Sequence, residues 1–135
     1  MLSNIHPLLT GELLLHLDRM GHSDSLVISD AHFPAWRIGT AVIDLPGADA
    51  PSLLAAVLTV VPLDEHPALD LMATTTGEVT DAQRALLAVA DADARFLARA
   101  EFYDEAARAS VIVRTGETRT FANAIVRKGV VQPVR

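Results

Sequence analysis

Two short apolar runs limit what this chain can fold into. Residues 25–29 (SLVIS) and 40–45 (TAVIDL) are apolar on successive positions rather than on every second one. A strand with this pattern buries both of its faces, which is typical of a parallel sheet covered by helices. The runs therefore predict an α/β fold, with a largely parallel sheet between helical layers.

Helix signals alternate with further strand signals along the whole chain. Leucines recur at helical spacing in residues 10–20, where Thr10 can cap the start and Gly21 suits a left-handed end. Pro51 stands where the first turn of a helix tolerates proline, and residues 80–83 (TDAQ) have the form of a capping box. Further strands are expected at 68–74, 94–99, 110–115 and 123–128, and a short helix at 102–109. Since no Gly/Ser linker or repeat interrupts the pattern, residues 1–135 are expected to form one domain.

Composition narrows the classes of partner. The net charge of −6 gives no electrostatic support for a nucleic-acid or anionic-membrane partner. The absence of cysteine removes disulfides, thiolate metal sites and thiol nucleophiles. The N-terminus does not have the pattern of a signal peptide, and the longest apolar-rich run, residues 53–63, is about half of what a membrane span needs. We therefore expect a soluble, cytoplasmic protein.

Ionisable side chains at the two ends of the first strand are the best candidates for a site. His22 precedes that strand, while Asp30 and His32 follow it, and such groups can move protons. The plain alternatives are a histidine at a helix end for His22 and a turn cap for Asp30. Asp30 and His32 could also form a metal pair, but no third ligand is evident. Arg99 and Asn123 could likewise be a solvated charge and a turn residue. No phosphate loop, HExxH or GxSxG motif is present, so the residues alone leave the function open.

Four segments resemble one known family, in its order. They are IHPLLTGELL (5–14), GHSDSLVISDAHFPA (21–35), FYDEAARASVIVRTGE (102–117) and FANAIVRKGV (121–130). Together they resemble the fucose mutarotase and ribose pyranase family, the FucU/RbsD proteins. The DAHFPA stretch is more similar to the fucose branch, because the ribose branch tends to have a smaller residue after DA.

The resemblance implies an RbsD-like fold, a cofactor-free and metal-free conversion of sugar anomers, a monosaccharide as ligand, and a ring-shaped homo-oligomer, often decameric. The family's proton donor falls on His22. Its substrate-binding positions fall on Asp30, Arg99, Phe121, Ala122 and Asn123. One departure is visible, because the family usually has tyrosine where this chain has Phe121.

Three functions follow as alternatives. The leading one is a mutarotase for L-fucose or a related aldose, with His22 as acid and base; the others are a ribose pyranase and a non-catalytic monosaccharide-binding protein. A span of eight residues from His22 to Asp30 can reach about 26 Å when extended. The site is therefore expected to be incomplete in one subunit, unless the GHSD segment turns back.

Overall fold

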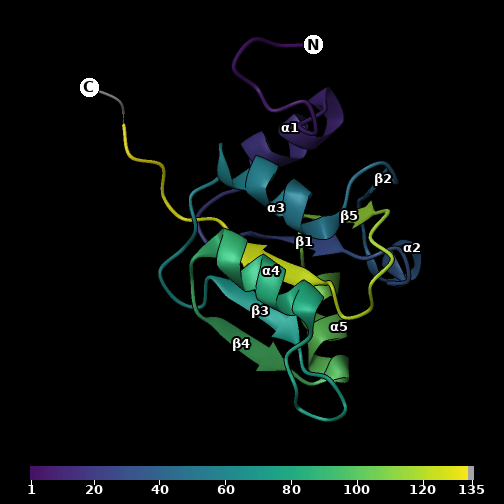
Figure 1. The fold of residues 1–135 in the computed structure, drawn as a ribbon. Helices are drawn as coiled ribbons and strands as arrows, with labels where there is room; N and C mark the ends of the chain where they lie inside the picture. Colours follow the sequence, from purple (N-terminus) through teal and green to yellow (C-terminus); the bar gives the residue numbers. More distant parts are fainter. Residues whose placement is uncertain (134–135) are drawn as a thin grey trace.

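The computed structural model describes residues 1–133, and its centre is one six-stranded sheet (Figure 1). The strand order is β2-β5-β1-β6-β3-β4. Neighbours run parallel in three pairs (β1·β5, β2·β5 and β3·β4), whereas β6 runs antiparallel to both β1 and β3. The strands are β1 (Ser25–Ser29), β2 (Val42–Leu45), β3 (Leu69–Met72), β4 (Ala94–Leu97), β5 (Val111–Thr115) and β6 (Ala124–Arg127).

Helices cover both faces of the sheet, as the buried strand patterns require. One apolar cluster joins a face of the sheet to α1, α3 and α4, and a second joins the opposite face to α2 and α5. Strand β1 shows why: Leu26 and Ile28 belong to the first cluster, and Val27 belongs to the second. The helices are α1 (Gly11–Arg19), α2 (Ala35–Ile38), α3 (Ala50–Leu58), α4 (Asp81–Ala90) and α5 (Arg99–Ala107).

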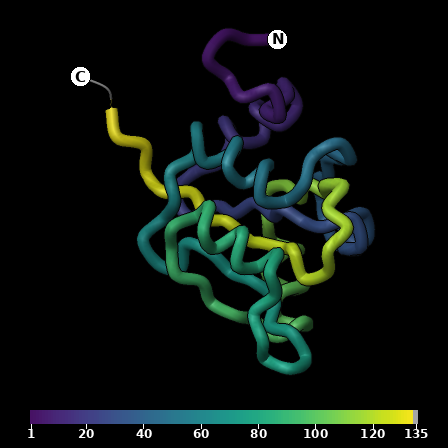
Figure 2. The backbone as a smooth tube through the Cα atoms, in the orientation of Figure 1, coloured from purple at the N-terminus to yellow at the C-terminus, as the bar shows by residue number. Residues whose placement is uncertain are grey.

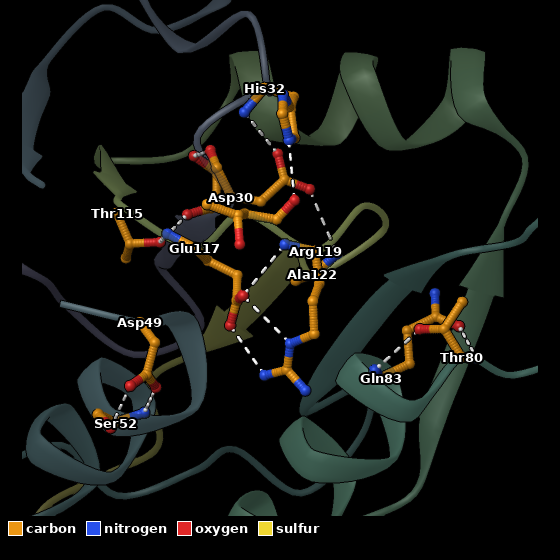
Figure 3. Close-up of polar contacts among 12 residues, drawn as sticks. Asp30, His32, Asp49, Ser52, Thr80, Gln83, Thr115, Glu117, Arg119 and Ala122 are labelled. Carbon is orange, nitrogen blue, oxygen red and sulfur yellow. Dashed lines mark hydrogen bonds and ion pairs between the residues drawn. The ribbon is translucent and has the colours of Figure 1, made fainter.

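Most local predictions are confirmed. Thr10 caps α1 by accepting from the backbone N–H of Leu13, and the capping box of Thr80 and Gln83 opens α4 (Figure 3). Pro51 lies in the first turn of α3. The largely parallel α/β sheet between helical layers is also present. None of the helices in residues 1–133 is long and apolar enough to cross a membrane.

Three details differ from the sequence predictions. Helix α5 begins at Arg99, which was expected to end a strand, and not at residue 102. Helix α1 ends at Met20 in an extended conformation, so Gly21 is not the left-handed residue; Ser23 takes that conformation instead, with φ of 69°. A hydrogen bond from the Gly21 N–H to the Asp24 carboxylate (2.7 Å) closes a turn there and removes the need for a glycine cap. The four-residue helix α2 was not expected, because it is too short to show a period.

The direction of β6 brings the loop that enters it to the carboxyl ends of β1 and β3. Strands β1, β3 and β4 point the same way, so their carboxyl ends share one edge of the sheet. Because β6 is antiparallel, its amino end lies at that same edge, beside the ends of β1 and β3. The chain entering β6 therefore meets the chain leaving β1. Both described ends of the chain lie away from this edge (Figure 2).

Candidate functional site at the carboxyl edge of the sheet

A cavity of about 210 Å³ lies at this edge. It brings together four residues singled out from the sequence: Asp30 after β1, Arg99 at the start of α5, and Phe121 and Asn123 before β6. His32 and Tyr103 also line it. Ligands of open α/β sheets bind in this position, beyond the carboxyl ends of strands.

Asp30 is the buried centre of the cavity wall, only 2% exposed. Its Oδ1 accepts hydrogen bonds from the backbone N–H groups of His32 and Phe33, both at 2.9 Å. Its Oδ2 accepts from the Ala122 N–H at 3.3 Å (Figure 3) and from Nδ2 of Asn123 at 3.1 Å. Burial raises the pKa of Asp30, and the backbone donors at His32, Phe33 and Ala122 offset this only in part. Each carboxylate oxygen therefore accepts two hydrogen bonds from the protein.

A second hydrogen bond joins Asn123 to Asp30. The backbone N–H of Asp30 donates to Oδ1 of Asn123 at 2.8 Å, so the Asn123 amide bonds both the backbone and the carboxylate of Asp30. Ala122 between them is fully buried and belongs to the apolar cluster on the α3 face. The end of β1 and the entrance to β6 therefore form one rigid unit, in which Ala122 contributes its backbone rather than its side chain.

Further contacts fasten the loop that leads to Phe121. The carbonyl of Glu117 accepts from the Ala31 N–H at 2.9 Å, and its buried carboxylate pairs with Arg119 at 2.9 Å (Figure 3). This pairing with Arg119 lowers the pKa of Glu117. Nε2 of His32 lies 2.9 Å from the Thr118 carbonyl oxygen, which can only accept, so this nitrogen carries the hydrogen.

Arg99 and Tyr103 form a pair one helical turn apart on α5. Nε of Arg99 donates to the Tyr103 hydroxyl at 3.2 Å, and its guanidinium carbon lies 5.4 Å from the ring centre. Tyr103 in turn packs edge-on against Phe33 with ring centres 5.5 Å apart. Since Nε is occupied, the terminal nitrogens of Arg99 are the ones available to a ligand. Tyr103 was not predicted as a site residue, although its spacing of four from Arg99 signals a shared helix face.

Phe121 closes the cavity with a half-buried ring and a left-handed backbone, φ 59°. It cannot supply a hydroxyl group. Tyr103, the single tyrosine of the chain, lines the same cavity and is its one phenolic group. The cavity thus combines one carboxylate, one guanidinium, one amide and several aromatic rings, which is a composition suited to a small polyhydroxylated ligand.

His22 does not join the other candidates in one chain. It lies before β1, at the amino end of the strand whose carboxyl end carries Asp30. Its side chain is 61% exposed and contacts Asp64, with Nε2 3.2 Å from Oδ1. This region is a separate, open hollow of about 530 Å³. Within residues 1–133 no group of three or more His, Asp or Glu side chains could hold a metal ion.

Comparison with known proteins identifies the family. Residues 3–131 match the model of the RbsD / FucU transport protein family. The chain belongs to the RbsD/FucU family. That match covers every candidate residue, from His22 to Asn123.

Solved structures of family members superpose closely on this chain. The fucose mutarotase from Streptococcus pneumoniae, solved with L-fucose, is 31% identical, with a TM-score of 0.91 over 97% of this chain and 100% of that one. FucU from Bifidobacterium longum is 35% identical, with a TM-score of 0.87 over 95% and 99%. Bacillus subtilis RbsD, solved with D-ribose, is 24% identical, with a TM-score of 0.81 over 98% and 100%; it supports the fold alone.

Proposed function

We propose that residues 1–135 act as one mutarotase domain that interconverts the anomers of L-fucose or a closely related aldose. The cavity at the carboxyl edge supports this most directly, because it gathers Asp30, Arg99 and Asn123 around a space of monosaccharide scale. The 31% identity to a fucose mutarotase that was solved with L-fucose points to the same sugar class.

The reaction needs proton transfer and little else. When a pyranose opens, the bond between the anomeric carbon and the ring oxygen breaks, and the anomeric oxygen forms the carbonyl. The ring oxygen gains a proton and the anomeric hydroxyl loses one; closure on the other face reverses both steps. Nothing is oxidised and no group leaves, so this chemistry calls for no cofactor. Imidazole, with an ordinary pKa near 6.5, is the side chain best suited to give and take these protons at neutrality.

In this proposal each side chain has one task. Asp30 accepts hydrogen bonds from sugar hydroxyls, and the terminal nitrogens of Arg99 donate to the sugar oxygens. Asn123 holds Asp30 in place, Ala122 shapes the wall through its backbone, and Phe121 packs against the sugar ring. His22 supplies the acid and base.

His22 must then come from a neighbouring subunit. It lies at the far end of β1 from Asp30 in the same chain, with the apolar core between them. A homo-oligomer in which the His22 end of one subunit faces the cavity of the next completes the site. We propose a closed ring, decameric by family resemblance; head-to-tail contacts close into a ring when the rotation between neighbours closes.

One observation favours a second function. Phe121 stands where the family usually has tyrosine, so the chain could bind a monosaccharide without accelerating its conversion. A ribose pyranase is the other alternative, but the 24% identity to RbsD supports only the shared fold.

Saturation-transfer NMR on sugar anomers tests these functions together. A mutarotase for L-fucose should accelerate exchange between its α and β signals, a pyranase should act on pyranose and furanose forms of ribose, and a binding protein should accelerate neither. His22→Ala should reduce exchange by at least about 10²-fold, the usual contribution of one positioned acid or base. His16→Ala, on α1, is the matched control and should leave exchange unchanged.

A further inference from the structure

Trp36, the single tryptophan of the chain, lies on the surface in a fixed orientation. It belongs to α2 and is 63% exposed. Its Nε1 donates to Oδ2 of Asp44 at 3.0 Å, and Oδ1 of Asp44 accepts from Nε of Arg114 at 2.7 Å. These bonds satisfy the one polar atom of the indole within the chain, so the surface left exposed is the apolar ring. A ring that is already held in one orientation loses little conformational freedom when a partner covers it.

Trp36 lies close to the cavity at the carboxyl edge. Helix α2 begins directly after Phe33 and Pro34, which line that cavity. Asp44 and Arg114 are partners in the register of β2 and β5, near the carboxyl ends of these strands, and they hold the ring at the same edge. In Figure 1, α2 lies beyond the tip of β1, whereas the segment after β6 leaves the sheet at its opposite end. A neighbouring molecule that approaches the cavity would therefore meet Trp36.

An apolar hollow of about 450 Å³ lies at the opposite end of β1. Its place follows from Met20, which precedes β1, and from Lys128, which follows β6; both line it. The hollow adjoins the turn that carries His22, because the Lys128 carbonyl accepts from the Ser23 N–H at 2.8 Å. Its apolar residues are Leu14, Leu17, Met20, Val60, Val61 and Val131. The molecule thus presents an exposed ring at one end and an apolar hollow at the other.

A second copy of this chain is the partner that fits both surfaces. When a molecule carries an exposed apolar group and, elsewhere, a hollow that can take it, copies associate head to tail. Charge favours the same pairing, because Arg37 follows Trp36 and Asp18 lines the hollow. Within residues 1–133 neither of these two charged side chains takes part in an ion pair. Lys128, the other charge in the lining, donates from Nζ to the Gly129 carbonyl at 3.2 Å.

We propose that Trp36 of one subunit docks into the apolar hollow of the next, and that this contact builds the interface at which a cavity meets His22 of its neighbour. This inference rests on the proposed function, which requires a head-to-tail interface but does not say which side chains hold it together. Trp36 is then the buried anchor of that interface, a role in which tryptophan is enriched.

The fluorescence of Trp36 reports on this contact alone, because the chain has no other tryptophan. In the assembled native protein, its emission should be shifted to the blue and protected from quenching by iodide. Dilution to the monomer should shift the emission to the red and expose the ring to iodide. A fully quenchable, red-shifted tryptophan in the assembled protein would overturn the proposal, and this measurement needs no variant.

Variants on the two surfaces test the contact from each side. Trp36→Ala should raise the dissociation constant of the assembly, measured by sedimentation, by at least about 30-fold, the loss typical of a truncated hot-spot residue. Val60→Asp places a carboxylate in the hollow and should weaken assembly to a similar extent. Phe96→Ala removes another exposed aromatic ring, on the edge strand β4, and is the matched control that should leave assembly unchanged. Circular dichroism verifies that each variant folds.

The outcomes separate this contact from the proposed function. Normal assembly of folded Trp36→Ala or Val60→Asp would overturn the contact, and so would an equal weakening by Phe96→Ala. If the assembled protein exchanges sugar anomers while Trp36 stays open to iodide, the docking fails and the proposed function stands. If Trp36 is protected in the assembly but His22→Ala leaves exchange unchanged, the docking stands and the proposed role of His22 fails.

Discussion

A site shared between subunits can be tested by mixing two inactive variants. His22→Ala removes the proposed acid and base, and Arg99→Ala removes a cavity residue without disturbing the buried bonds of Asp30. Each variant alone should exchange sugar anomers at about 1% of the native rate or less. When both chains are produced together, a mixed ring contains some interfaces at which an intact His22 meets an intact Arg99.

The size of the recovery follows from the geometry. Strand β1 spans four residue steps, which is about 13 Å at 3.3 Å per residue, and His22 and Asp30 lie beyond its opposite ends. One chain cannot close that distance through its packed core, so in the proposed ring each site takes His22 from one subunit and the cavity from its neighbour. With equal amounts of the two chains, His22 is intact in about half of the sites and Arg99 is intact in about half. Both are intact in about one quarter of the sites, and these regain exchange activity.

Saturation-transfer NMR on the purified mixed ring measures this recovery, with two affinity tags to select mixed assemblies. The double variant His22→Ala/Arg99→Ala assembled with native chains is the matched control. It should also give about one quarter of the native rate for a shared site, but about one half if each chain holds a complete site. No recovery in mixed rings of the single variants would refute the shared site.

Three further predictions concern the cavity and the sheet. Phe121→Tyr should raise the exchange rate, toward the about 10²-fold that one proton-transferring group contributes, with sugar affinity similar; an unchanged rate in the folded variant would remove the missing hydroxyl from the explanation. Asp30→Asn should weaken sugar binding as measured by titration, because an amide nitrogen would face donors that the carboxylate now satisfies, while chelator treatment of the native protein should leave exchange intact. Burial would raise the pKa of Asp70, but hydrogen bonds from Arg95 and Arg127 outweigh it and hold the pKa below the ordinary 3.8. The stability from this group is therefore complete above that pH and lost as pH falls below it, so a urea midpoint that stays constant from about pH 4 to pH 3 would contradict the sign.

Local patterns predicted much of the fold because they act over few residues. The capping box at Thr80 and Gln83 and the proline in the first turn of α3 depend on neighbouring atoms, and both are confirmed. The direction of β6 depends on how a long loop returns to the sheet, which no local pattern encodes. The left-handed residue after α1 was predicted at Gly21 but lies at Ser23. Local sequence could not show this, because the bonds that hold Ser23 come from the distant residues Lys128 and Asp64.

The candidate site shows the same division. The pattern before and after β1 already placed His22 and Asp30 at opposite ends of one strand. The meeting of Asp30 with Asn123 needs the antiparallel β6, and the pairing of Tyr103 with Arg99 needs both residues on one face of α5. Asp64 carried no signal in the sequence, because it reaches His22 across 42 positions.

The position of β6 in the sheet has a consequence for how the protein is made. In the order β2-β5-β1-β6-β3-β4, strands β1 and β3 are joined only through β6, which comes after all the other strands in the chain. Until β6 is synthesised, β2-β5-β1 and β3-β4 can therefore form only two separate pieces of sheet. Each piece has an unpaired strand edge that can pair with another chain and aggregate. Insertion of β6 seals both edges, and in the same movement it brings Asn123 to Asp30. A nascent chain thus completes the cavity at the carboxyl edge in the same step that pairs the exposed strand edges of β1 and β3.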